Sequence, residues 1–359
     1  MPIDFSAQDW SRVKQTYSQW WAGELDRPLL CAFVGGKQPG RPEAKTPHRH
    51  RTAQYPFSVS PEDVVDRWDY GLSSHRYVGD GFPSVWLDFG PGVLAAFLGA
   101  RTGVDENTVW FHVDDDREIA DIHFSLNLQH PWLKRIESLI GAAQKRWGSA
   151  VQIGMTDLGG NLDILSTFRP SEKLLLDLYD HPDEVKRLTW EAHEMWWKCF
   201  EHLNDLLQPI NPGYTAWTPI FSQQPYYMLQ CDFCYMIGTS MFDQFVKPEL
   251  AATSRKLVNP FYHLDGPGQL AHLDSLLEIP ELRGVQWIPG AGAAPPRQWP
   301  QVYRKIRDAG KLMQVIGGLD DLMAVIDTLG DGRGIYWHGG VGPEREGELM
   351  KVLERYGAA

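Results

Sequence analysis

One strand-like run carries the residues of this sequence that are best placed to do chemistry. The stretch FYHLDG, residues 261–266, puts His263 and Asp265 two positions apart. Residues i and i+2 of a β-strand share one face, so the imidazole and the carboxylate would project side by side. Such a pair can act as general base and acid, or supply two ligands to a metal ion. A third ligand is not identifiable from the sequence, and zinc is the candidate ion.

Acids, indoles and a second imidazole also stand at or near the ends of other apolar runs. The predicted catalytic set, beside His263 and Asp265, is Asp88, Asp157, Asp232 and His338. The predicted substrate-binding set is Trp86, Trp217, Gln286, Trp287, Trp337 and Arg41. Indole faces among acids suit a methylammonium group through cation–π attraction, and they suit the C–H face of a sugar equally well.

The elements that must position these residues alternate along the chain. Short apolar runs predict strands at residues 27–35, 149–160, 213–220, 260–266, 282–290, 311–318 and 334–341. Apolar residues at three- and four-residue spacing predict helices at 171–203, 240–259, 268–279, 296–310, 319–329 and 343–357. We expect His272 and Asp274 on the surface of the helix that follows the FYHLDG run.

Roughly eight strand–helix units without a dinucleotide-binding fingerprint favour one fold of the α/β class, a (β/α)8 TIM barrel with additional N-terminal helices. We expect a single domain over residues 1–359, in which residues 1–80 form N-terminal helices, the first strand and a long loop. That loop, residues 34–63, is rich in Pro, Gly and basic residues, as functional or disordered loops often are. Active sites of such barrels lie at the carboxyl ends of the strands.

The overall composition excludes several classes of function. The formal net charge of −12 disfavours nucleic-acid binding, which needs clustered Lys and Arg. No apolar run reaches the roughly 18 residues of a membrane span, and the polar N-terminal segment does not resemble a signal peptide, so we expect a cytoplasmic protein. The 4 cysteines are too few for a disulfide framework. We interpret Cys231 and Cys234 as incidental, half-buried thiols.

Six motifs from about residue 80 onward resemble the uroporphyrinogen decarboxylase superfamily, which includes that decarboxylase and the corrinoid- or coenzyme-M-linked methyltransferases. The motifs are FPSVWLDFGPGVLAAFLG, MTDLGGNLDILSTFRP, CDFCYMIGTSMFDQFVKPEL, FYHLDG, VQWIPG and GIYWHGGVGPERE. The resemblance implies a (β/α)8 barrel with extra N-terminal helices. Homodimers are common in this family, so it also implies a homodimer as a candidate assembly.

The resemblance implies roles for individual residues. Asp88 is similar to the decarboxylase's essential aspartate, and His338 to its histidine at the end of the last strand. Arg41 loosely matches its arginine-rich motif, and Asp232 stands where it has a serine. The methyltransferases have a zinc-binding His-x-Cys where this chain has His263-Leu264-Asp265, so the soft thiolate ligand is replaced by an oxygen ligand.

Three functions follow as hypotheses. The first is a small-molecule, methyltransferase-like enzyme with a non-porphyrin substrate, which the family links to a corrinoid protein as partner; uroporphyrinogen decarboxylase activity itself is a further alternative. The second is a carbohydrate-active lyase or hydrolase that uses paired carboxylates among indole walls. The third is a binding protein that keeps the barrel without catalysis.

Overall fold

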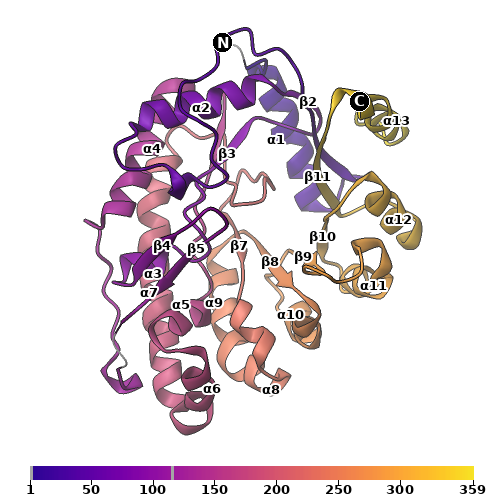
Figure 1. Ribbon diagram of the computed structural model, residues 1–359. Helices are drawn as coiled ribbons and strands as arrows, with labels where there is room; N and C mark the ends of the chain where they lie inside the picture. The colour runs from indigo at the N-terminus through magenta and orange to yellow at the C-terminus, as the bar shows by residue number, and fades with distance from the viewer. Residues whose placement is uncertain (1–2, 115–116) are drawn as a thin grey trace.

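The apolar runs form mostly parallel strands in the computed structural model, which describes residues 3–114 and 117–359 (Figure 1). The central sheet has 7 strands in the order β2-β1-β11-β10-β9-β8-β7, and two smaller sheets pair β3 with β6 and β4 with β5. The strands are β1 (Leu29–Val34), β2 (Arg76–Gly79), β3 (Ser84–Trp86), β4 (Arg101–Val104), β5 (Val109–His112), β6 (Gln152–Gly154), β7 (Tyr226–Leu229), β8 (Asn259–Asp265), β9 (Gly284–Ile288), β10 (Leu312–Val315) and β11 (Ile335–Val341).

Helices follow most of the parallel strands, and α10 to α13 lie along the outer side of β8 to β11 (Figure 1). The longer helices are α1 (Ala7–Ala22), α2 (Pro61–Ser73), α4 (Pro131–Trp147), α5 (Asn161–Phe168), α6 (Ser171–Asp180), α7 (Pro182–Leu207), α9 (Lys247–Lys256), α11 (Pro300–Asp308), α12 (Leu319–Leu329) and α13 (Glu346–Arg355). The shorter helical segments are η1 (Thr52–Gln54), α3 (Leu94–Phe97), η2 (Ile119–Asp121), η3 (Asp232–Met236), α8 (Thr239–Met241), η4 (Phe242–Val246), η5 (Pro267–His272), α10 (Leu273–Leu277), η6 (Pro296–Gln298) and η7 (Pro343–Arg345).

The N-terminal helix α1 carries several of the tryptophans on its buried face. Ser6 caps it by accepting a hydrogen bond from the Asp9 amide, and its buried face carries Trp20 and Trp21. The Trp20 ring stacks on Phe261 of β8 with 6.2 Å between ring centroids. The Trp21 ring meets the same phenylalanine edge to face at 6.0 Å. These indoles are core and anchor α1 to the sheet, since aromatic pairs add to the free energy of burial.

One expected strand is absent from the described residues, and one hairpin was not expected. Residues 213–220 form no named strand; Tyr214 makes only an isolated bridge to Ser222, and the strand of this region is β7. The β4–β5 hairpin was not predicted, because its short segments give little periodicity. Among the described residues, the 7-stranded sheet ends at β2 on one side and β7 on the other, so backbone pairing does not close it into a ring.

The structure also bears on membrane insertion. Across residues 3–114 and 117–359, no helix combines the length and apolar character that crossing a membrane requires.

Candidate functional site

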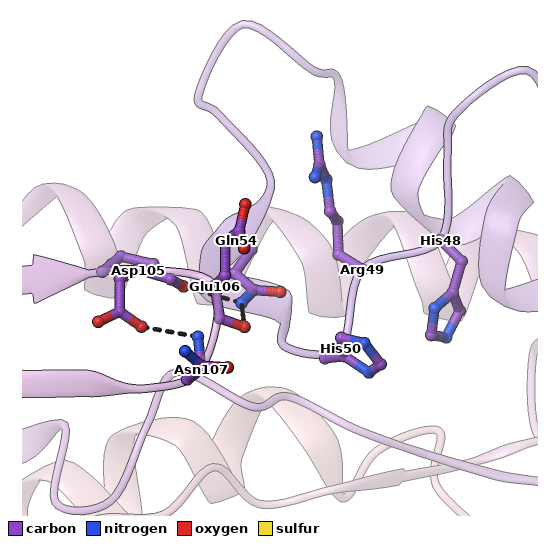
Figure 2. Close-up of a pocket in the computed structure, with 8 residues that line it drawn as sticks. His48, Arg49, His50, Gln54, Asp105, Glu106 and Asn107 are labelled. Carbon is purple, nitrogen blue, oxygen red and sulfur yellow. Dashed lines mark hydrogen bonds between the residues drawn. The ribbon is translucent and has the colours of Figure 1, made fainter.

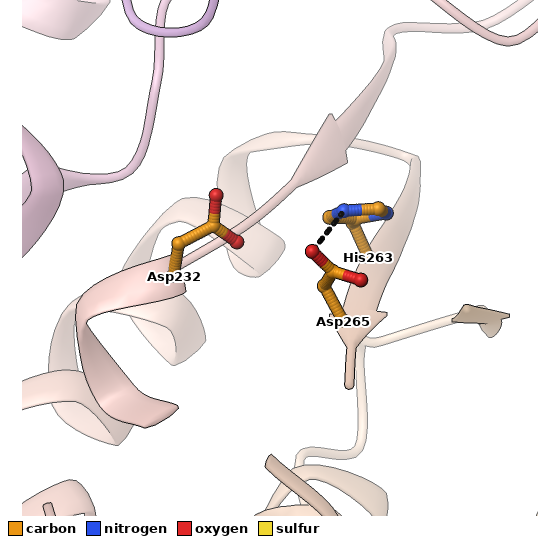
Figure 3. Close-up of side chains that lie close together, drawn as sticks. All are labelled: Asp232, His263 and Asp265. Carbon is orange, nitrogen blue, oxygen red and sulfur yellow. Dashed lines mark ion pairs between the residues drawn. The ribbon is translucent and has the colours of Figure 1, made fainter. Parts of the chain in front are cut away.

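Three of the predicted residues come together at the carboxyl end of the sheet. His263 and Asp265 share a face near the end of β8, and Asp232 opens the turn η3 beside them (Figure 3). One ligand atom from each of the three side chains lies within 4.8 Å of the others. The His263 Nε2 and Asp265 Oδ2 atoms are 4.0 Å apart. Asp232 is therefore the candidate for the third ligand, which the sequence alone did not identify.

A chain of neutral side chains orients the His263 ring. His263 Nδ1 donates a hydrogen bond to Gln286 Oε1, from the residue directly opposite on β9. Gln286 Nε2 donates to Gln314 Oε1 at 2.8 Å, and Gln314 Nε2 donates to Thr218 Oγ1 at 3.0 Å. With Nδ1 bonded to Gln286, Nε2 is the nitrogen that faces Asp265 and is left for a metal ion, an arrangement common among imidazoles that bind metals. The Trp217 ring meets this imidazole edge to face at 5.5 Å.

Asp232 adds a second carboxyl group to the site, opposite His263 and Asp265 of β8. Protein atoms crowd its carboxyl group although the residue as a whole reaches solvent, and this burial raises its pKa above the ordinary value. Attraction from His263 opposes the shift, and repulsion from Asp265 adds to it. An opposite charge, from a metal ion or a protonated ligand, would relieve the repulsion between these two carboxylates.

A cavity of about 320 Å³ opens directly beside Asp232. Its polar wall includes Asp163, Thr167 and Gln230, and its apolar wall includes Phe233 and Met236. The described residues that line it include no lysine or arginine. The cavity therefore suits a small, uncharged or cationic ligand better than an anionic one.

The backbone beside this cavity needs two glycines. A Cβ on Gly159 would lie 2.6 Å from the Cα of Gly92, and both residues have positive φ, 83° and 77°. This close approach joins the loop after β3 to the loop after β6, and the Val93 amide donates to the Asp157 carbonyl at 2.9 Å. The glycines thus set one wall of the cavity.

The sequence reasoning missed Asp163, which lies in the first turn of α5. Its Oδ2 and Oδ1 accept hydrogen bonds from the backbone amides of Asp232 and Phe233, at 3.0 and 2.7 Å. Burial raises the pKa of Asp163 to about 7, and repulsion from Asp232 contributes. An acid in the first turn of a helix after a strand end was the available signal, but the same motif drew attention only to Asp157.

The other predicted acids lie near the site without joining the cluster. Asp157 is buried; burial raises its pKa to about 7, and Gln230 Nε2 lies 3.3 Å from its Oδ1. Asp88 forms an ion pair with Arg51 at 2.9 Å. Burial raises the pKa of Asp88, while the Gly90 amide and the Arg51 charge oppose the shift. Catalytic roles for these two acids stay predictions.

His338 and Arg41 are engaged elsewhere. His338 Nδ1 donates to the Cys31 carbonyl at 3.1 Å, and burial lowers the pKa of its ring, so the imidazole is neutral at pH 7. The Arg41 guanidinium forms ion pairs with Asp66 and Asp69 of α2, each at 2.6 Å. These contacts tie the long loop to α2, and neither residue belongs to the cluster around His263.

Two of the predicted substrate-binding indoles are buried side chains that pack outside the cluster. Trp287 is 0% exposed and packs against Trp299, and Trp337 is buried with its Nε1 donating to the Gly317 carbonyl at 2.9 Å. Neighbouring residues of a strand face opposite sides, so Gln286 faces the site and Trp287 the surrounding helices. Trp86 is half-buried beside Asp88, and Trp217 alone among the four predicted indoles contacts the cluster in the described structure.

Two further expectations near the site, for His272 and for the cysteine pair, need correction. His272 is not on a helix surface: it is 0% exposed, its ring stacks on Phe242, and its Nε2 donates to the Cys234 carbonyl at 2.9 Å. Asp274 is exposed, as expected, and pairs with Lys305. Cys231 and Cys234 are buried, not half-buried.

A second cavity, of about 630 Å³, lies between the long loop and the β4–β5 hairpin (Figure 2). His48, Arg49 and His50 line one side of it. On the other side, Gln54 Nε2 donates to the carbonyls of Asp105 and Glu106 at 2.9 and 3.0 Å. Figure 2 shows Arg49 pointing away from the two imidazoles, so these three side chains do not converge on one point.

Comparison with known proteins identifies a similar fold but no family. No known family matches the sequence, and no curated protein matches it. A solved structure, described as a methyltransferase from Methanosarcina mazei, is similar over 96% of this chain and 97% of its own, with a TM-score of 0.60 and 14% sequence identity. At that identity, the likeness shows a shared mixed α/β fold and not a shared activity.

Proposed function

We propose that this chain is a small-molecule enzyme of the uroporphyrinogen decarboxylase superfamily, methyltransferase-like in its chemistry and acting on a non-porphyrin substrate. The observation that carries the proposal is the cluster of Asp232, His263 and Asp265 beside a cavity of about 320 Å³. The similarity to a methyltransferase structure supports it at the level of the fold. The six sequence motifs support the choice of superfamily.

The three side chains fit a divalent metal ion. Imidazole and carboxylate together suit zinc and other first-row divalent ions, and the buried amide chain already orients the His263 lone pair. When bound, such an ion would lower the pKa of a coordinated hydroxyl or thiol and so provide a nucleophile near neutral pH. Asp232 and Asp265 would balance its charge, and Trp217 would shield His263 from water.

The cavity supports a non-porphyrin substrate. A porphyrinogen carries many carboxylates and needs basic partners, whereas the wall beside Asp232 offers Asp163 and no lysine or arginine among its described residues. Arg41, the predicted basic contact, is paired with Asp66 and Asp69. A small methylated amine, ether or alcohol fits this wall. A corrinoid protein as methyl donor and a homodimeric assembly belong to the same proposal.

The proposal includes a closed barrel. Strands β1 and β7 to β11 of the central sheet, together with β3 and β6 of the small sheet, would supply the eight strands of such a barrel. Beyond β6, the Met155 amide donates to the Thr215 carbonyl at 2.9 Å, in the segment that leads to β7.

Metal content tests the proposal most directly. We expect the purified protein to bind Zn²⁺ in a 1:1 ratio and His263→Ala to weaken binding on the order of 100-fold or more, because one of three protein ligands is lost. The matched control is His338→Ala, a second strand-end histidine outside the cluster, which should leave the affinity unchanged. Equal affinities for wild type and His263→Ala would refute the metal site.

One observation favours a second candidate, a carbohydrate-active lyase or hydrolase. Burial raises the pKa values of Asp157 and Asp163 to about 7, close to those of general acids in glycoside hydrolysis. Such an enzyme would turn over without added metal. Chelation with EDTA separates the two candidates, since turnover of a sugar substrate that survives chelation would favour the second.

A further inference from the structure

The two parts of the candidate metal site are held by different means. His263 and Asp265 belong to β8, which is paired on both sides, with β7 and with β9. Asp232 stands on η3, a five-residue turn outside the sheet, and the side chain at its N-cap, Cys231, makes no capping hydrogen bond. The position of Asp232 relative to the β8 pair therefore depends on whatever holds η3.

A buried carboxylate from another helix supplies the missing cap. The first amides of a helical turn have no partner within the turn, so an acceptor from outside fixes where the turn begins. Asp163 provides one oxygen to the Asp232 amide at 3.0 Å and the other to the Phe233 amide at 2.7 Å. Both oxygens are used, and two bonds fix the direction of the turn as well as its distance.

The carboxylate itself has little freedom to move. A Cβ on Gly160 would lie 2.5 Å from Asp163 Oδ2 and 2.2 Å from the Gln230 carbonyl oxygen, so glycine is the residue that leaves room for this approach. Gln230 is the second residue before Asp232 in the chain. Gly160 thus lies against both the Asp163 carboxylate and the chain that leads into η3.

We propose that Asp163 is a positioning residue whose bidentate cap on η3 holds the Asp232 carboxylate against His263 and Asp265. The metal-affinity part of this inference rests on the proposed function, but the cap itself does not. Asp163 touches the backbone of Asp232 and not the three candidate ligand atoms, so it acts on the site through Asp232.

A double-mutant cycle on Zn²⁺ affinity tests the route of action. Dissociation constants are measured by chelator competition for wild type, Asp163→Ala, Asp232→Ala and the double variant. We expect Asp163→Ala to weaken binding about tenfold or more, as removal of groups that orient ligands usually does. In the Asp232→Ala background the same change should have no further effect. An equal loss in both backgrounds would overturn the proposal.

Amide hydrogen exchange at Asp232 and Phe233 tests the cap without any metal. We expect Asp163→Ala to speed exchange of both amides and Asp163→Asn, which keeps one acceptor oxygen, to speed exchange less. Unchanged exchange in both variants would overturn the proposal. The Asn variant also keeps the test valid if Asp163→Ala does not fold.

A matched control separates positioning from general destabilisation. Asp177 is a buried acid on α6, bonded to Arg169 at 2.6 Å. Asp177→Ala should lower stability and leave both the Zn²⁺ affinity and the exchange of the two amides unchanged; an equal effect would overturn the proposal. If wild type binds no Zn²⁺, the proposed function fails, and the exchange experiment alone decides whether Asp163 holds the turn.

Discussion

The two sides of the candidate site are built from opposite kinds of chemistry. On the β8–β10 side, the neutral amides of Gln286 and Gln314 hold His263 in one orientation. On the β6–α5 side, the carboxyl groups of Asp157 and Asp163 lie buried among backbone amides, and burial raises the pKa of each to about 7. One side is fixed by hydrogen bonds that do not titrate, and the other changes charge near neutral pH.

The difference separates geometry from charge. An imidazole held by amides keeps its direction at any pH at which the fold survives, so the β8 side sets where a ligand atom must be. The carboxyl side sets how much negative charge surrounds that atom, because each proton lost there adds a charge in a poorly solvated region. A cationic ligand or metal ion would bind more tightly as pH rises through 7.

The largest effect is expected on the side of Asp157 and Asp163, from replacing an acid that titrates near neutral pH. The pKa of Asp157 is about 7 in the folded protein against 3.8 as the ordinary value. As pH rises above 4, the unfolded chain loses this proton first, so the folded state loses stability until pH passes 7. We expect Asp157→Asn, which cannot ionise, to remove on the order of 2 to 4 kcal/mol of that decline between pH 4 and 8.

Urea unfolding at several pH values measures this effect. The control is Asp274→Asn, because Asp274 is an exposed acid paired with Lys305 and its replacement should leave the slope with pH almost unchanged. Parallel stability curves for wild type and Asp157→Asn would contradict a buried, titrating carboxyl at this position.

The second-largest effect is expected on the β8–β10 side, from replacing the amide that orients His263. Gln286→Leu removes the acceptor of His263 Nδ1, so the ring is free to turn and to exchange its proton between the two nitrogens. We expect Zn²⁺ affinity to fall about 10- to 100-fold, with little change in how affinity depends on pH. Isothermal titration at pH 6 and pH 8 measures both.

Gln152→Leu is the matched control for that variant. Gln152 is also a buried strand glutamine, and its Nε2 donates to the Gly213 carbonyl at 2.9 Å without touching His263. Its loss should cost stability alone. If both variants weaken Zn²⁺ equally, the amide chain is not what orients the imidazole.

The β8 side could be predicted from sequence because its signals are local. His263 and Asp265 are two apart in a strand, and Gln286 falls at the register position opposite His263 on the next strand. The buried indoles could not be placed in this way. Strands of a parallel sheet are buried on both faces, so VQWIP, which is apolar apart from Gln286, does not show by alternation whether Gln286 or Trp287 faces the site.

The other side depends on contacts between distant segments. Asp163 and Asp232 are 69 residues apart in sequence, and only the folded chain brings the carboxylate to the turn. The predicted strand at 213–220 failed for a related reason: the segment carries β-branched and aromatic residues, yet tertiary context leaves it as an irregular stretch that carries Trp217. The predicted elements indicated the region of the site. The contacts that cap η3 could be seen only in the structure.

The smallest expected effect lies at the far end of the amide chain. Thr218→Val removes the hydroxyl that accepts from Gln314 Nε2, three hydrogen bonds from His263. Gln314 Oε1 still accepts from Gln286, so the imidazole should keep its orientation and Zn²⁺ affinity should fall less than about threefold, while the unpaired amide costs about 1 to 2 kcal/mol of stability. Thermal unfolding and isothermal titration on one sample separate the two quantities. A loss of affinity as large as that of Gln286→Leu would mean that the orientation of His263 is a property of the whole chain of amides and not of its first member.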